Sequence, residues 1–475
     1  MSIRYALPAI ILLLISFAGK GQQTRSFTPD STVFIGELNA FFEDIRIKEN
    51  REEALAKLQV FATYWNGGDF TIPQKQLIYT TANLMLERRL KSYPDFTEYL
   101  EMLPAFKKSE VNEEDFNIWL ERAKQMLEES RSSRNFSNLI DATQIFLGQQ
   151  YLYTTRIHTW KIDAEKYRFI SDSVFAVMFS NAELICFTDR DSTFIHRTNG
   201  TWYPDSETWL GAGGKITWQR AGLSPDTVFA EINNYKLSLR DSNFEITPVT
   251  FYHKAYLPGP LQGTLTEKTS SYKVTPDNTH YPQFSSDIRN LFIGNIFQDV
   301  DYEGGFAMKG AKILGTGDEF KMAKLTFKRP YRDKRGNYDL LVARSDMFVI
   351  EHDRMYASQA AVNIFHQDDS IFHSGLQFKY RNREREVSML RIEKGIEQSP
   401  YFDTYHDVDI DCEAVYWNMD EDEIDFRSAK GLNKVNRASF VSDRYYSERQ
   451  FDFLQGLDFK HPLLWLRDYS RGYDT

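Results

Sequence analysis

The spacing of the apolar residues changes near residue 150, and this change constrains the fold class. Before that point, apolar residues recur every three or four positions, as in Ala54, Leu58, Phe61 and Trp65, which is the spacing of one helix face. From Tyr151 to about residue 430, short runs of Val, Ile, Thr, Phe and Tyr alternate with turn-forming residues. The sequence therefore predicts an α-helical part followed by an all-β part.

Six helices are expected before residue 150, and several have a recognisable start or stop. Gly67 and Gly68 would end the second helix, Pro73 and Pro94 would open the third and fourth, and Asn112 is a suitable N-cap for the fifth. Taken in pairs, the helices repeat about every forty residues, which is typical of helical-hairpin repeats. Residues 22–150 are therefore expected to form a helical-hairpin array.

A short motif recurs in the β part: Asp is followed by Ser or Thr, and Phe stands three residues after the Asp. An Asp and a neighbouring hydroxyl favour a tight turn, and the Phe would begin the buried face of the next strand. The irregular spacing of the copies favours a solenoid-like, β-helix-type body over residues 151–440, with residues 441–475 as a short helical tail. The alternative is that such turns are simply common. The five copies start at Asp172, Asp191, Asp226, Asp241 and Asp369.

The first 21 residues have the three parts of a cleavable secretory signal peptide. Arg4 supplies the positive charge, residues 6–18 form the apolar stretch, and Gly19 and Gly21 are the small residues before a cut at Gln22. An uncleaved N-terminal helix is the alternative. We expect an exported protein that is periplasmic, associated with the outer membrane or secreted. No later run approaches about 18 apolar residues, so the mature chain is not expected to be integral to the inner membrane.

Charge and cysteine content exclude two further classes. The net charge is −10, which argues against a general affinity for nucleic acid. Cys186 and Cys412 are far apart and neither belongs to a CxxC pair, so a structural zinc site is not indicated.

Three segments resemble a family of large, uncharacterised exported proteins of Bacteroidota. They are residues 304–312, residues 369–375, and Ser399-Pro400-Tyr401-Phe402 together with Tyr405 and His406. The resemblance covers most of the mature chain and implies the same architecture and compartment, but it assigns no functional residues. Family members continue beyond the position of His461, so the resemblance also implies a truncated or split member, with residues 441–475 as the start of a missing domain.

No catalytic residue is predicted. The segment from Gly211 to Thr217 is similar to a phosphate-binding loop, but Trp209 stands where that motif needs Gly, and Ile216 where it needs Ser or Thr. GxSxG and HExxH motifs are absent from the sequence. The segment around Gly213 is therefore expected to be a turn before a strand.

Four acidic residues, Asp407, Asp409, Asp411 and Glu413, alternate with apolar ones. On a strand, this alternation would place all four carboxylates on one face. Such a face could bind Ca²⁺, the one cofactor suggested, or supply the acid pair of a glycosidase. The alternative is a solvated strand face.

Two basic turns stand out against the acidic background. Clustered guanidinium groups bind carboxylates or phosphates in a bidentate manner, so an anionic glycan or lipid headgroup is a candidate ligand. The alternative is that these turns are solvated hairpin tips which protect sheet edges. The candidate anion-binding residues are Arg329, Arg332, Arg335, Arg381 and Arg383.

Together these features favour an exported, non-enzymatic scaffold or interaction protein of the bacterial cell envelope, with an envelope protein or a glycan as its partner. Repeat-like organisation builds extended binding surfaces, which suits such a role. The alternative is a β-helix-type polysaccharide-active enzyme, a lyase or a glycosidase, that uses the carboxylates of residues 407–413.

Overall fold

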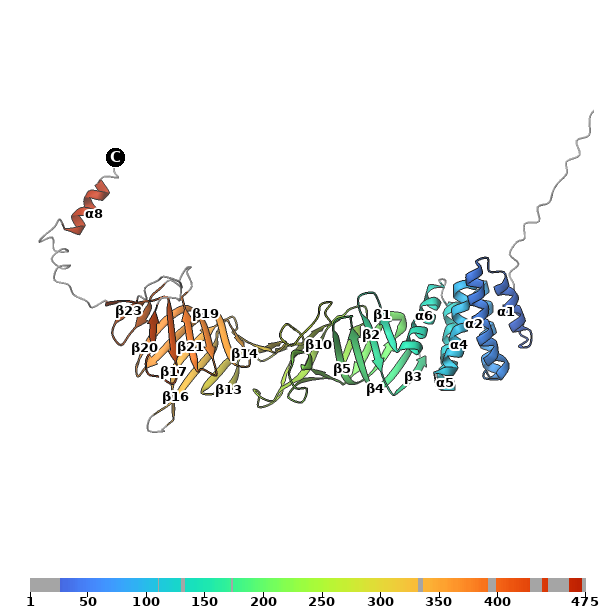
Figure 1. Cartoon of the computed structure of the whole chain (residues 1–475), viewed down its shortest axis with the longest axis horizontal. Coiled ribbons are helices and arrows are strands. Elements are labelled where there is room, and N and C mark those ends of the chain that lie inside the picture. Colours follow the sequence, from blue (N-terminus) through green and yellow to red (C-terminus); the bar gives the residue numbers. More distant parts are fainter. Residues whose placement is uncertain are drawn as a thin grey trace, which may run out of the picture. The chain divides into compact units, whose positions relative to one another are not determined.

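The computed structural model confirms that helices come first and strands follow (Figure 1). It describes residues 26–109, 111–129, 133–171, 174–331, 336–391, 399–427, 438–442 and 461–471; the expected signal peptide lies outside these residues. Strands make up 44% of the chain, so the protein is mostly β. The chain divides into two compact units. The first comprises residues 1–184, 199–210 and 238–240, and the second comprises residues 185–198, 211–237 and 241–475.

The helices of the first unit lie where the periodicity predicts them. They are α1 (Phe34–Glu43), α2 (Lys48–Gly67), α3 (Ile72–Glu87), η1 (Ser92–Phe96), α4 (Thr97–Lys108), α5 (Glu113–Glu129) and α6 (Arg134–Gln149). Helix α2 packs on α4, α3 on α5, and α4 on α6. Each of these three helices thus contacts the α-helix after next in the chain.

Local signals in the sequence account for the ends of these helices. Gly68, in the left-handed region with a φ of 83°, follows the last residue of α2, as glycine commonly does. Asn112 caps α5, because its side-chain oxygen accepts a hydrogen bond from the backbone N–H of Asp115 at 2.8 Å. The predicted face of α2, Ala54, Leu58, Phe61 and Trp65, is buried.

The division between the two units runs through four of the strands that follow, β4, β5, β6 and β9. In the first unit, β1 pairs with β2 and β3 with β4, each in an antiparallel manner. The bounds are β1 (Tyr151–Thr154), β2 (Thr159–Asp163), β3 (Lys166–Ser171), β4 (Phe175–Phe187), β5 (Ser192–Tyr203), η2 (Pro204–Ser206), β6 (Thr208–Ala212), β7 (Lys215–Thr217), η3 (Gln219–Ala221), β8 (Val228–Ile232) and β9 (Asn234–Ser238).

In the second unit an antiparallel ladder runs β7–β8–β10–β11–β12–β14. Six strands then close a ring in the order β14–β15–β18–β19–β17–β16 and back to β14. The bounds are β10 (Asn243–His253), β11 (Leu261–Lys268), β12 (Gln283–Ser286), β13 (Leu291–Phe297), β14 (Val300–Lys309), β15 (Lys312–Thr316), β16 (Ala323–Pro330), β17 (Asn337–Ser345), β18 (Met347–Ile350) and β19 (Arg354–His366).

Two strands take part in both layers of this closed barrel. The first half of β14 pairs with β13 and β16, and its second half pairs with β12 and β15. The exchange occurs at Gly304 and Gly305. Nearby, the ring of Tyr302 lies so close to Gly315 that a Cβ there would be 2.6 Å from it. Strand β19 likewise pairs first with β18 and then with β17.

The remaining strands extend the two layers from β20. One layer continues β20–β22–β23–β26, and the other continues β20–β21–β24–β25. These strands are β20 (Asp369–Arg381), β21 (Glu386–Leu390), β22 (Tyr401–Asp403), β23 (Val408–Asp411), β24 (Ala414–Asn418), β25 (Asp425–Arg427) and β26 (Ser439–Ser442); helix α8 (Pro462–Arg471) follows. The antiparallel pairs and the closed barrel do not establish the expected β-helix-type solenoid.

The recurrent Asp motif predicts turns well and buried faces less well. Its described copies precede or open strands β5, β8, β10 and β20. The Phe is buried in β8 and β10, at Phe229 and Phe244, but Phe194 and Phe372 are 41% and 38% exposed. In β5 and β20 the neighbouring Thr193 and His373 occupy the interior instead.

None of the described helices is both long enough and apolar enough to cross a membrane.

Candidate functional site

The acidic segment from Asp407 to Glu413 does not form one continuous strand. Strand β23 contains Asp409 and Asp411, whereas Asp407 lies in the preceding turn with a φ of 56°, and Glu413 lies between β23 and β24. Asp411 forms an ion pair with Arg391. The four-residue face is thus reduced to two carboxylates of one strand. Within the described parts of the chain, no three His, Cys, Asp or Glu side chains are grouped to hold a metal ion; calcium binding stays a prediction.

At the first basic turn, the guanidinium group of Arg329 contacts the segment that follows β24. Its Nη1 lies 2.6 Å from Asp422 Oδ1, and its Nη2 donates to the carbonyl oxygens of Met419 and Glu421 at 2.5 and 2.9 Å. Arg329 therefore joins the end of β16 to the loop between β24 and β25. This role explains the residue without any external anion.

At the second basic turn, Arg381 pairs with Glu386 at 2.6 Å across the hairpin of β20 and β21. Arg383 is exposed. Arg332 and Arg335 lie outside the described residues. Anion binding by the whole set therefore stays a prediction, and Arg329 and Arg381 already have anionic partners within the chain.

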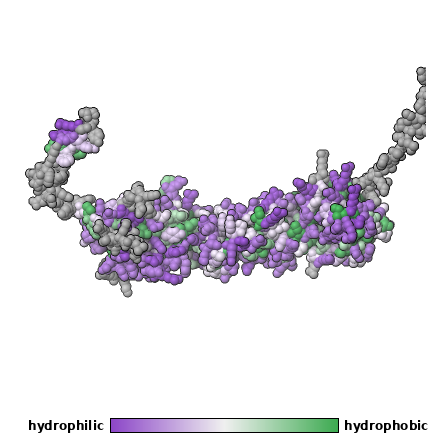
Figure 2. Space-filling model, turned by 45° about the horizontal axis from the view of Figure 1, so that its top comes forward, coloured by the Kyte–Doolittle hydropathy of each residue, from purple (hydrophilic) through white to green (hydrophobic). Residues whose placement is uncertain are grey.

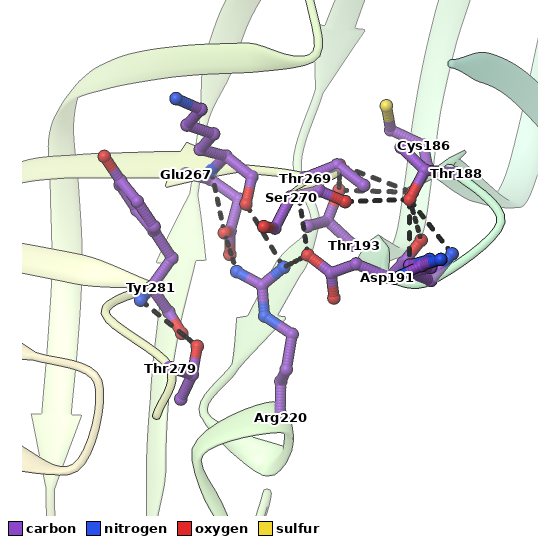
Figure 3. Close-up of polar contacts among 12 residues, drawn as sticks. Cys186, Thr188, Asp191, Thr193, Arg220, Glu267, Thr269, Ser270, Thr279 and Tyr281 are labelled. Carbon is purple, nitrogen blue, oxygen red and sulfur yellow. Dashed lines mark hydrogen bonds and ion pairs between the residues drawn. The ribbon is translucent and has the colours of Figure 1, made fainter. Parts of the chain in front are cut away.

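A buried charge cluster in the second unit was not predicted from the sequence (Figure 3). Arg220 of η3 lies between two carboxylates: its Nη1 is 2.8 Å from Asp191 Oδ2, and its Nη2 contacts Glu267 Oε1. The Asp191 and Glu267 side chains are only 3% and 4% exposed. Asp191 also accepts from the backbone N–H of Ser270 at 2.6 Å, and Arg220 donates to the carbonyl oxygen of Lys268 at 3.2 Å.

Hydroxyl groups surround this cluster. Thr193 and Thr269 share a hydrogen bond between their Oγ1 atoms at 2.8 Å, and both lie 3.5 Å from the carbonyl oxygen of Cys186. Thr188 donates to the carbonyl oxygen of Ser270 at 2.8 Å. Burial raises the pKa of the Cys186 thiol to about 11, so this cysteine is not a thiolate at neutral pH.

The charges within the cluster do not balance, because two carboxylates share one guanidinium. Burial raises the pKa of the Glu267 carboxyl to about 7, while the Arg220 charge and hydrogen bonds oppose the rise. The cluster joins the turn before β5, the helical turn η3 and the end of β11. We interpret the cluster as a structural link between these three segments of the second unit. The charge of the cluster changes with pH.

A groove of about 660 Å³ lies on the outer face of strands β15, β18, β19, β20 and β21. Its floor is apolar: Val349 and Tyr356 face each other in register, flanked by Met347 and Leu390. Met347 is 46% exposed. A groove of this size lies in the range of ligand sites.

Basic side chains line the same groove. Lys312 Nζ lies 3.0 Å from Glu351, and Arg354 contacts the other oxygen of the same carboxylate. Lys379 pairs in register with Tyr356 across β19 and β20, and its ammonium group forms no ion pair with any residue that the structure describes. Three cations and one carboxylate therefore line the groove, and the carboxylate pairs with two of the cations. The register of four strands brings these residues together, and no sequence motif marks them.

Apolar side chains are also exposed near β26, in the second unit. Tyr401, Ile410 and Phe440 pair in register across β22, β23 and β26, and therefore share one face. Tyr401 and Ile410 are each 2% exposed, but Phe440 is 59% exposed and Val441, on the opposite face of β26, is 58% exposed. Among the described residues, β26 is thus the last strand of this layer, and it carries an exposed apolar side chain on each face.

Helix α8 is also apolar and exposed. Its large apolar residues are between 38% and 67% exposed, and Trp465 is 67% exposed. Figure 2 shows a largely hydrophilic surface, with both hydrophobic and hydrophilic residues on α8. The sequence predicts this exposure from the apolar residues 463–466, because a helix with so little polar face normally has a partner.

Comparison with protein-family models, with curated proteins and with solved structures found no match to this chain.

Proposed function

We propose that this protein is an exported, non-enzymatic scaffold of the cell envelope that binds a protein partner at the end of its β body. The observation that carries the proposal is the exposure of Phe440 and Val441 on β26, the last strand of one layer in the part of the chain that the structure describes. Exposed apolar residues that continue a buried core row are typical of protein interaction sites. The partner would continue the ladder beside β26 and cover the Phe440 ring.

The surroundings of Phe440 support a partner that enters the interior of the body. Phe440 lies 6.5 Å, between ring centroids, from Phe426 of β25, and Phe426 lies 6.1 Å from the buried Tyr401. These rings belong to opposite layers, so Phe440 stands where the apolar interior between the layers reaches the surface. An apolar side chain of the partner would complete this aromatic row.

Export is the part of the proposal that rests on the leader sequence of residues 1–21. The expected solenoid-like arrangement of the strands stays part of this proposal. The alternative of a polysaccharide-active enzyme would require the acidic segment, of which only Asp409 and Asp411 share strand β23. We therefore favour the scaffold.

The test is photocrosslinking in the cell envelope. p-Benzoyl-phenylalanine is placed at position 440, and in a matched variant at position 320, where Phe320 is 96% exposed in a turn. We expect one polypeptide to crosslink from position 440 and not from position 320. Equal crosslinking from both positions, or none from position 440, would exclude the proposed surface. Adducts between two copies of this chain would show that this surface mediates self-association and does not bind a different protein.

A further inference from the structure

We propose that the groove on the outer face of β15, β18, β19, β20 and β21 binds an anionic amphiphile, a single carboxylate attached to an aliphatic chain. The residues of this groove differ from those around Phe440, so the inference does not depend on the protein partner proposed above.

The floor of the groove supports the aliphatic part of such a ligand. The outward-facing positions of a sheet that faces water on one side are normally polar. Here Val349 and Tyr356 form a pair in register, and Met347 and Leu390 lie beside them. All four are partly exposed or exposed, so an aliphatic chain on this floor would remove their apolar surface from water.

The charges of the groove support the anionic head. The chain as a whole has a net charge of −10, yet this groove is lined by three cations and one carboxylate. Glu351 is 15% exposed and holds both Lys312 and Arg354. Lys379 is thus the cation of the groove that has no ion-pair partner among the described residues, and one lysine suits a singly charged head.

The position of Lys379 joins the two parts. Lys379 is opposite Tyr356 on one side and Ser388 on the other. A carboxylate at the Lys379 ammonium would therefore leave its chain directly above the Tyr356 ring and the adjoining Val349. An acidic saccharide fits less well, because the neutral hydrogen-bonding side chains of the groove are few: Ser358, Gln377 and Ser388. Of these, Ser388 is 7% exposed.

The test is isothermal titration calorimetry of the full mature chain with dodecanoate, which is kept below its critical micelle concentration. We expect saturable binding to one site, weakened about tenfold by Lys379→Gln, since loss of one charge-assisted contact costs about 1.4 kcal/mol or more. Met347→Gln keeps the side-chain length, removes apolar surface, and should weaken binding about fivefold. Lys236→Gln, on an exposed position of β9, is the matched control and should bind as the wild type does.

Two further probes distinguish the contribution of the carboxylate head to binding from that of the aliphatic tail. Acetate carries the head alone, and dodecyl maltoside carries the tail with a neutral head; neither should reach the affinity of dodecanoate. The inference is overturned if dodecanoate does not bind, if Lys379→Gln and Met347→Gln bind it like the wild type, or if oligogalacturonate competes for the same site more tightly. Thermal unfolding of each variant verifies that it is folded. Phe440→Ser should leave dodecanoate binding unchanged. The dodecanoate test is therefore independent of whether the proposed protein partner binds at Phe440.

Discussion

Arg220 Nη1 lies 2.8 Å from Asp191 Oδ2, and this contact joins two residues that are 29 positions apart in the chain. The same guanidinium group contacts Glu267, a further 47 positions along. One side chain thus fixes the turn before β5, the helical turn η3 and the end of β11 relative to one another.

Replacement of Arg220 by Met should destabilise the protein strongly. The variant leaves Asp191 and Glu267 buried without their counter-charge, which typically costs about 3–5 kcal/mol. Urea denaturation measures the free energy of unfolding. Arg240→Met is the matched control, because Arg240 is 64% exposed and pairs with Glu207 at the surface; it should cost about 1 kcal/mol or less. Equal losses in the two variants would contradict the assigned role of Arg220.

Glu267 should make stability depend on pH. Its pKa is about 7 in the folded protein, against an ordinary value of 4.5. Between these values the folded state binds more protons than the unfolded state, so the free energy of unfolding falls as pH rises from about 4.5 to 7. Glu267→Gln cannot titrate, and its stability relative to the wild type should rise by about 3 kcal/mol across this window. Urea denaturation at pH 4.5 and pH 8 checks this, and a constant difference between the two proteins would refute it.

The double substitution Asp409→Asn and Asp411→Asn should have little effect. Asp411 is 67% exposed in its pair with Arg391, and surface substitutions usually change stability by about 0.5 kcal/mol or less. We expect the melting temperature of both proteins to be independent of added Ca²⁺. A melting temperature that rises with Ca²⁺ in the wild type, and not in the double variant, would instead establish a metal site.

Removal of residues 461–475 should leave the β body almost as stable as before. The apolar residues of α8 are exposed, Trp465 by 67% and Leu463 by 66%, so the deletion removes little buried surface. We expect a change of about 0.5 kcal/mol or less in the free energy of unfolding. A loss of several kcal/mol would mean that α8 packs on the body in solution.

The mature protein should begin at Gln22 or within a residue or two of it. N-terminal sequencing of the protein from the envelope fraction tests this, and finding Met1 there would contradict export by cleavage. Gly21→Trp should block processing, because signal peptidase requires a small residue before the cut. Gly36→Trp, which lies in α1 and outside the leader, should be processed normally.

The helices and the turns could be predicted from the sequence because their signals are local. The buried face of α2 and the Asn112 cap follow from spacing and residue type within a few positions. The buried face of each strand follows less directly, because alternation leaves two choices and the partner strands decide between them. In β5, Thr193 takes the inner position through its hydrogen bond to Thr269, and Phe194 faces outward.

The candidate sites were the least predictable part. Tyr356 and Lys379 adjoin only because β19 and β20 pair in one register, and Arg220 meets Glu267 only through the path of the chain around η3. For the acidic segment, four alternating carboxylates share one face only if the strand continues, and β23 ends at Asp411.

Strands β14 and β19 each serve two layers of the closed barrel, and this has a consequence for how the barrel can open. Separation of either layer must break hydrogen bonds of a segment that also holds the other layer. Because both layers share these two strands, we expect the six strands of the ring to open together, and not one layer at a time.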